Sequence, residues 1–271
     1  MTVSAQGVAS NSAAVNTATA NTVEPPLVRV VGMTMAFGAN VVQRDLDFDI
    51  RRREVLAIVG ASGCGKSTLL RHLIGLQTPA AGQVLYGKQD LHHCDEESLA
   101  ALRRQFGVMF QAGALWSSMT VGENLMLPLR LFTPLDRKAR ELRARFKLAL
   151  VGLDGTFDLE PASLSGGMRK RAAIARALAL DPHLLYLDEP SSGLDPFSTA
   201  RLDELILNLR HHLGTTVVMV THAIDSVFAV ADRLLFLDEQ QKTMTALDAP
   251  QTLAEHGPER VREFLRRGKR P

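Results

Sequence analysis

The chain has 271 residues, with 31 Lys or Arg against 29 Asp or Glu, so its formal net charge at pH 7 is only +2. This small excess argues against a nucleic-acid partner, because proteins that bind nucleic acid neutralise phosphates with many basic side chains. A hydrophobic content of 46% with 22% charged residues excludes the collagen-like, disulfide-scaffold and wholly disordered classes. The length predicts one to two domains, and the isolated Cys64 and Cys94 predict reduced thiols.

The start of the chain differs in composition from the rest. Residues 1–26 are rich in Ala, Ser, Thr, Asn and Val, and they lack the basic and compact apolar regions of a signal peptide. We therefore expect residues 1–26 to form a disordered tail. No apolar run in the sequence reaches the roughly 18 to 20 residues that cross a bilayer, so the chain is not expected to span a membrane on its own.

From residue 27 onward, short apolar runs alternate with segments of helical periodicity. Runs that are apolar throughout predict strands of a parallel sheet covered by helices on both faces, so the predicted class is α/β. Residues 47–50 alternate polar and apolar after a turn at Gly38, which predicts a small antiparallel sheet in front of the core. The predicted strands are residues 27–31, 55–59, 106–110, 184–187, 217–220 and 234–237.

Residues 60–67 read GASGCGKS, which matches GxxxxGK[ST] directly after one predicted strand and before a predicted helix. In such a phosphate-binding loop (P-loop), backbone N–H groups surround a phosphate and the helix N-terminus adds positive charge. Lys66 would reach the terminal phosphates, and Ser67 would ligate Mg²⁺. The loop predicts a bound nucleoside triphosphate with Mg²⁺. The expected nucleotide contacts are Gly60, Ala61, Ser62, Gly63, Cys64, Gly65, Lys66, Ser67 and Thr68.

Helical signals dominate the middle of the chain. Apolar residues recur at spacings of three and four along residues 135–150, as in an amphipathic helix. We expect a helical subdomain of about residues 91–163, inserted into the P-loop core, with this stripe packed against neighbouring helices. The stripe consists of Leu135, Ala139, Leu142, Phe146, Ala149 and Leu150.

Asp188 and Glu189 follow the apolar run 184–187. Such a pair often marks the point where a strand reaches solvent, but parallel strands bring their C-terminal ends to one sheet edge, where Asp188 can meet Lys66. Asp188 would then hold Mg²⁺ through water, and Glu189 would accept a proton from the attacking water or orient it. The pair therefore predicts hydrolysis of the bound nucleotide.

Residues 164–168, with the sequence LSGGM, lie shortly before this carboxylate pair. With the P-loop upstream, the sequence resembles the ATP-binding cassette (ABC) ATPases from residue 27 to about residue 247. The resemblance implies ATP and Mg²⁺ as cofactors, and it implies a cassette domain over residues 27–250. Its fold would be a P-loop NTPase core with a mainly parallel sheet, a small antiparallel β subdomain and an inserted helical subdomain.

The resemblance also implies roles for residues outside the P-loop. Phe37 would stack on adenine, Gln111 would reach the metal and the water, and His222 would be the switch histidine. Residues 192–195 would contact a partner cassette, with Asp195 near the nucleotide. The implied catalytic residues are Glu189, His222 and Gln111, and the implied metal ligands are Ser67, Gln111 and Asp188.

The LSGGM segment predicts a second anion site. Ser165 and Gly167 precede the predicted helix 168–180, although the chain already has one complete phosphate loop. In ABC ATPases, the signature loop of one cassette caps the γ-phosphate bound by the other, so a single cassette implies a homodimer with two equivalent sites. This loop adds Leu164, Ser165, Gly166 and Gly167 to the expected nucleotide contacts.

Residues 111–124 and 127–130 resemble the Mla-type ATPases, which power Mce-associated phospholipid transport. Met168 and residues 169–171 fit that branch, whereas Trp116 stands where Phe is more usual. The likeness implies an MlaE-like integral-membrane permease, with scope for an accessory cytoplasmic subunit and an Mce-domain protein. The chain would then lie peripherally on the cytoplasmic face of the inner (plasma) membrane.

Two alternatives to phospholipid transport remain open. One is the ATPase of an ABC importer for a polar solute of the amino-acid type. The other is a non-transport ABC clamp acting on ribosomes or DNA, but the chain has neither a second cassette nor a long coiled-coil insertion between the P-loop and residue 164.

The C-terminal segment is short and basic. Within residues 251–271, Val261, Phe264 and Leu265 lie on one helical face. We expect these residues to form a basic helical tail, ending in a solvated terminal helix.

Overall fold

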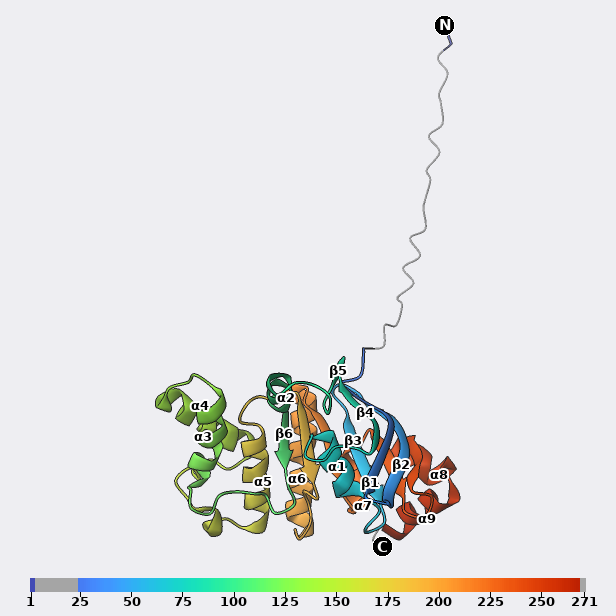
Figure 1. Cartoon of the computed structure of the whole chain (residues 1–271). Helices are drawn as coiled ribbons and strands as arrows, with labels where there is room; N and C mark the ends of the chain where they lie inside the picture. The colour runs from blue at the N-terminus through green and yellow to red at the C-terminus, as the bar shows by residue number, and fades with distance from the viewer. Residues whose placement is uncertain (3–23, 269–271) are drawn as a thin grey trace.

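The computed structural model describes residues 1–2 and 24–268 (Figure 1). The disordered tail expected at residues 1–26 lies almost wholly outside these residues. The main sheet has the order β10-β9-β3-β8-β7-β6, parallel except for β10, which is antiparallel to β9. Its strands are β3 (Val55–Gly60), β6 (Phe106–Met109), β7 (Leu184–Asp188), β8 (Thr216–Val220), β9 (Arg233–Asp238) and β10 (Thr243–Asp248).

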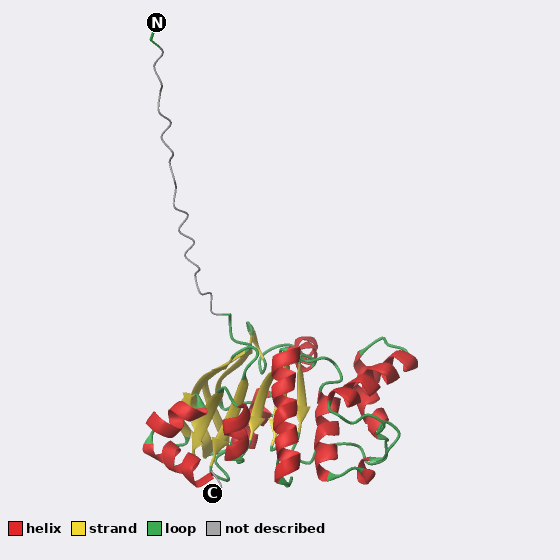
Figure 2. Cartoon of the chain, turned by 180° about the vertical axis from the view of Figure 1, so that it is seen from behind, coloured by secondary structure: helices red, strands yellow, loops and turns green. Residues whose placement is uncertain are grey.

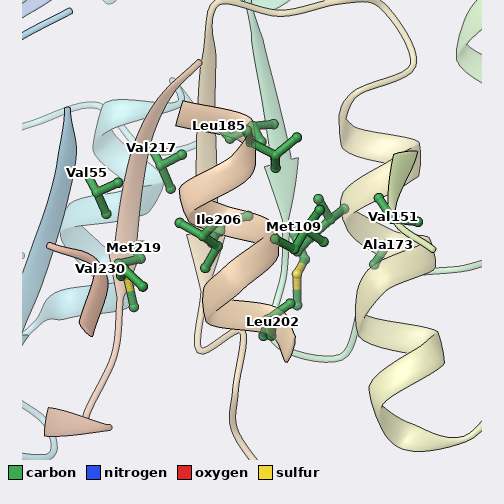
Figure 3. Packing of buried hydrophobic residues seen from close by; sticks show 14 of the residues in the cluster. Val55, Met109, Val151, Ala173, Leu185, Leu202, Ile206, Val217, Met219 and Val230 are labelled. Carbon is green, nitrogen blue, oxygen red and sulfur yellow. The ribbon is translucent and has the colours of Figure 1, made fainter. Parts of the chain in front are cut away.

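Every residue of β3, β7, β8 and β9 is buried, which confirms the predicted α/β class. Alternate residues of β3 face opposite sides, since Val55 and Ala57 belong to one hydrophobic cluster whereas Leu56 and Ile58 belong to the other. Figure 3 shows the first cluster, in which Ile206 of α6 (Pro196–Leu213) packs on the sheet. The helices α5 (Gly166–Ala177) and α7 (Ile224–Val230) lie on this same side.

A second, antiparallel sheet in the order β2-β1-β4-β5 shares the other cluster with α1 (Lys66–Leu73) and α2 (Glu96–Arg103). Residues 47–50 belong to it, as expected. The strand expected at residues 27–31 does not join the parallel core, because residues 28–31 begin β1 of this second sheet instead. Val28 and Val30 are buried while Val31 is exposed, because only one face of the second sheet packs on the core. Its strands are β1 (Val28–Phe37), β2 (Asn40–Ile50), β4 (Ala81–Tyr86) and β5 (Gln89–Asp90).

The span 91–163, expected to be a helical subdomain, is not helical throughout. It includes β6, which pairs with β7 in the main sheet, and α2, which packs near the second sheet. Beyond β6 the chain forms α3 (Val121–Phe132) and α4 (Arg137–Leu150), which pack against each other and against α5. These two helices lie at one end of the molecule, opposite α8 (Pro250–His256) and α9 (Glu259–Gly268) (Figures 1 and 2).

The prediction that the apolar stripe of α4 packs against neighbouring helices is wrong for Leu142 and Phe146, although Leu150 of the same stripe packs against the core cluster. Leu142 and Phe146 are 71% and 59% exposed, whereas Ala144 and Leu148 are buried in the core cluster. Both sets satisfy a spacing of four, so helical periodicity alone does not distinguish them. The buried Lys147, which pairs with Asp181 just beyond α5, lies on the inward side.

The C-terminal helix α9 is not simply solvated, contrary to expectation. Val261 and Leu265 are buried, and the Phe264 ring lies 5.2 Å from the Phe236 ring of β9 in an edge-on arrangement. These contacts bury one face of α9 on the folded body, and Arg260 also pairs with Asp238 and Glu239 at the end of β9, whereas Arg266 and Arg267 are exposed. None of the helices within residues 24–268 combines the length and the apolar character that a bilayer crossing requires.

Candidate nucleotide-binding site

The P-loop connects β3 to α1 at the C-terminal edge of the main sheet. Gly60 has φ of 152°, and a Cβ there would lie 2.4 Å from the Leu237 carbonyl oxygen, so only glycine fits. Lys66 Nζ donates to the carbonyl oxygens of Gly60 and Ala61, each at 2.9 Å, so the ammonium lies against the loop. The other predicted loop contacts, Ala61, Ser62, Gly63 and Gly65, lie before α1, and Thr68 lies in its first turn.

Cys64 differs from its neighbours in the loop. Its side chain is 2% exposed, and burial raises the pKa of the Cys64 thiol. The sulfur packs beneath Gly60, where an added Cβ would lie 2.7 Å from it. Cys64 can therefore contact a nucleotide only through its backbone.

Ser67 and Asp188 meet at the sheet edge, although they are 121 positions apart. The Ser67 hydroxyl donates to Asp188 Oδ1 at 3.1 Å, and burial raises the pKa of Asp188 although the Ser67 hydrogen bond lowers it. Parallel strands bring the end of β7 to the same edge as the loop after β3. A hydroxyl and a carboxylate are hard oxygen ligands, so this pair fits Mg²⁺.

Glu189 follows β7 in a left-handed conformation with φ of 49°, which costs a non-glycine residue roughly 1–2 kcal/mol. Its N–H donates to the Val220 carbonyl oxygen at 2.8 Å. Its carboxylate Oε2 lies 2.8 Å from His222 Nδ1, and the side chain of Glu189 is 12% exposed while that of His222 is 67% exposed. The structure thus places a carboxylate and an imidazole together, one residue beyond Asp188.

Phe37 and Gln111 make no hydrogen bond with Ser67, Asp188 or Glu189 among the described residues. Phe37 ends β1 and is 53% exposed, and the adjoining β2 is tied to the P-loop by the hydrogen bond from Gln43 Nε2 to the Cys64 carbonyl oxygen. Gln111 follows β6 and is exposed. The hydrogen bond found at Gln111 is made by its backbone, because its carbonyl oxygen accepts from Lys170 Nζ at 2.6 Å.

The signature segment caps α5. The Ser165 hydroxyl accepts from the Met168 N–H at 3.3 Å, and Asp195 caps α6 in the same way through the Ser198 N–H at 2.9 Å. A Cβ at Gly167 would lie 3.2 Å from the Ser198 hydroxyl, so the starts of α5 and α6 are neighbours. Within the described part of the chain, no hydrogen bond or ion pair joins residues 164–167, including Leu164 and Gly166, to the P-loop.

The basic residues 169–171 carry no role predicted from the sequence beyond their resemblance to one family branch. In the structure, each side chain of this basic run bonds a different backbone carbonyl, and Lys170 bonds both Gln111 and Glu189. Nothing in the sequence identifies these acceptors, because every residue carries a backbone carbonyl.

The P-loop, the carboxylates at the end of β7 and a separately capped α5 together form the arrangement of an ATP-binding cassette. The ABC transporter family profile matches residues 43–192, which is more than half of the chain. The chain belongs to the ABC transporter family.

Curated relatives agree on this family and carry different transport names. The chain is 41% identical over 219 residues to the probable ribonucleotide transport ATP-binding protein Mkl of Mycobacterium leprae, and this match covers 80% of the chain but 62% of that relative. It is 35% identical to the intermembrane phospholipid transport system ATP-binding protein MlaF of Haemophilus influenzae, over 89% of the chain and 90% of MlaF. It is 42% identical to the methionine import ATP-binding protein MetN of Caulobacter vibrioides, over 77% of the chain and 62% of MetN.

A solved ABC cassette shares the fold. It is a dimeric ATP-binding cassette in a post-hydrolysis state bound to ADP and Pi, and it aligns with a TM-score of 0.74 at 29% identity. The alignment covers 82% of this chain and 98% of that cassette. The match therefore extends over almost the entire cassette.

Proposed function

We propose that this chain is the ATP-hydrolysing subunit of an ABC transporter and that it energises phospholipid transport through a separate permease. The ATPase assignment rests on one observation: the Ser67 hydroxyl donates a hydrogen bond of 3.1 Å to Asp188 beside the P-loop, and Glu189 is the next residue. This set supplies a phosphate cradle, oxygen ligands for Mg²⁺ and a carboxylate for water at one sheet edge.

In the proposed reaction, the P-loop N–H groups and Lys66 hold the phosphates of ATP, and Phe37 stacks on adenine. Ser67 and Asp188 would hold Mg²⁺, which would neutralise charge on the phosphates. Glu189 accepts a proton from water as the water oxygen bonds to the γ-phosphorus and the bond to the β-phosphate oxygen breaks, giving ADP and inorganic phosphate. His222 and Gln111 complete this group by orienting Glu189 and the water.

The signature residues require a second copy of the chain in this proposal. Ser165 and Gly167 form an amide-rich turn that, among the described residues, makes no hydrogen bond or ion pair with the P-loop of the same chain. In a head-to-tail homodimer, the signature loop and Asp195 of one copy lie across the nucleotide of the other, which makes two equivalent sites. The dimeric state of the solved cassette relative supports this arrangement.

A surface groove between β6 and α3 offers a contact surface for the permease. Its volume is about 320 Å³, and Trp116, Pro128, Leu131 and Phe132 line it between β6 and α3. Trp116, Leu131 and Phe132 are 57%, 62% and 53% exposed within this one groove, and a contiguous exposed apolar patch often marks a partner surface. We place an MlaE-like permease here, with the chain peripheral on the cytoplasmic face of the inner membrane, where an accessory subunit and an Mce-domain protein can join.

The phospholipid assignment rests on the MlaF relative, because the alignment spans 90% of its length. The amino-acid importer remains the second candidate, since the methionine-import relative is 42% identical over a shorter share of its own length. To decide between them, the chain is purified with its permease in mild detergent and reconstituted in proteoliposomes. Phospholipid bound in native mass spectra and lipid-stimulated ATP hydrolysis support lipid transport, whereas stimulation by an amino acid and its receptor supports the importer.

Loss of Lys66 is expected to weaken ATP binding itself. Lys66→Ala removes the ammonium held at 2.9 Å from two loop carbonyl oxygens, so the phosphates lose a charge-assisted contact and affinity falls by about tenfold or more. Calorimetric titration with ATP measures this. Lys88→Ala, at an exposed lysine between β4 and β5, is the matched control. Equal affinities of the two variants contradict the role given to Lys66.

A further inference from the structure

Helix α5 contributes a lysine to the loops that surround the proposed reaction. Lys170 lies one turn into α5, which packs against β6, α6 and the pair α3 and α4 (Figure 1). Its Nζ donates to the Gln111 carbonyl oxygen at 2.6 Å and to the Glu189 carbonyl oxygen at 3.1 Å. One ammonium thus connects the segment after β6 with the segment after β7.

Hydrogen bonds hold the backbone of Glu189 at both its N–H and its carbonyl oxygen. Its N–H donates to Val220 in β8 at 2.8 Å, and its carbonyl oxygen accepts from Lys170 and from the Ser192 N–H at 3.2 Å. A positive φ at a non-glycine residue persists only where the surroundings enforce it. Because the backbone conformation of Glu189 sets the direction of its Cα–Cβ bond, these three bonds also direct its carboxylate.

The positive charge of Lys170 lies close to the negative charges of Glu189 and Asp188. Burial lowers the pKa of the Lys170 ammonium, and the negative charges of Glu189 and Asp188 offset this lowering only in part. The half-buried ammonium therefore lies in the field of two carboxylates, where a charge-assisted bond to a carbonyl is stronger than on an open surface.

We propose that Lys170 is a positioning residue for ATP hydrolysis: it holds the Glu189 peptide so that the carboxylate faces the attacking water, and it links this peptide to the segment at Gln111. The inference rests on the role proposed above for Glu189. Lys170 touches neither water nor phosphate in this account, so it acts only through the carbonyl oxygen of Glu189.

The first test compares two neighbouring variants of the full-length chain. Lys170→Met removes the ammonium but keeps an unbranched side chain, and it is expected to lower kcat by about tenfold or more with KM for ATP changed less than about twofold, since a small displacement of a catalytic group is costly. Arg171→Met is the matched control, because Arg171 Nη1 donates to the Val151 and Gly152 carbonyl oxygens instead. It is expected to keep kcat within about twofold of wild type.

The second test asks whether Lys170 acts through Glu189. In a double-mutant cycle, Lys170→Met is expected to cause little further loss of kcat once Glu189→Gln is present, because the two residues serve one step. A loss equal to that in the wild-type background overturns the inference, as does an equal loss in Arg171→Met or a parallel loss of ATP affinity.

The outcomes also separate this inference from the proposed function. If Glu189→Gln lowers kcat and Lys170→Met does not, only the role of Lys170 is wrong. If Glu189→Gln itself leaves kcat unchanged, the role proposed for Glu189 fails, and the positioning role fails with it. Thermal melting of each variant shows whether a loss of kcat reflects unfolding.

Discussion

Replacing Glu189 with Gln is expected to lower ATP hydrolysis by about 10² or more while ATP still binds. The amide has nearly the same shape as the carboxylate but does not accept a proton from water. Lys66, Ser67 and Asp188 are unchanged, so the phosphate cradle is expected to remain. Measured kcat, together with ATP affinity by calorimetry, checks both parts, and light scattering shows whether the dimer persists in ATP.

The fold offers a matched control for this substitution. Asp238 ends β9 and Glu239 follows it, just as Asp188 ends β7 and Glu189 follows it, and β9 also neighbours the P-loop strand β3. Glu239 is exposed and pairs with Arg260 of α9 at 3.3 Å. Glu239→Gln is expected to keep kcat within about twofold of wild type. Wild-type turnover in Glu189→Gln, or an equal loss in Glu239→Gln, contradicts the assignment of the catalytic carboxylate.

Mixing two inactive variants is expected to restore activity if the sites are shared between copies. Lys66→Ala damages a P-loop, and Ser165→Arg places a bulky cation in the signature turn. In a mixed dimer both lesions fall in one site, because the P-loop of the first chain faces the signature of the second, and the other site stays intact. An equal mixture forms mixed dimers in about half of its population, so about a quarter of wild-type ATPase activity is expected if the sites act independently.

The mixing experiment needs a folding control, because Ser165 caps the N-terminus of α5. Ser165 accepts the Met168 N–H at 3.3 Å, so Ser165→Arg also removes a helix cap worth about 1 kcal/mol, and thermal melting must show that the variant is folded. Each variant alone is expected to be nearly inactive. A Ser165→Arg protein that hydrolyses ATP normally as a dilute monomer contradicts the shared site, since the signature then contributes nothing across the dimer.

The sequence predicted the features that depend on local pattern. The apolar strand, the glycines and Lys66-Ser67 form one continuous segment, so the P-loop was recognisable without any tertiary contact. The apolar runs at residues 184–187 and 217–220 predicted parallel strands, and the common edge of such strands predicted that Asp188 lies near the loop. The family resemblance added the residues whose local sequence carries little signal, such as Phe37 and His222.

Only the tertiary structure decided which face of a helix is covered and which carbonyl a side chain reaches. Periodicity indicated an apolar stripe on α4 but assigned Leu142 and Phe146 to the packed side, whereas Ala144 and Leu148 are buried there. Lys170 bonds carbonyl oxygens 59 and 19 positions away. Backbone acceptors are the same at every residue, so the sequence does not mark them, and the choice depends on how α5 packs between β6 and α6.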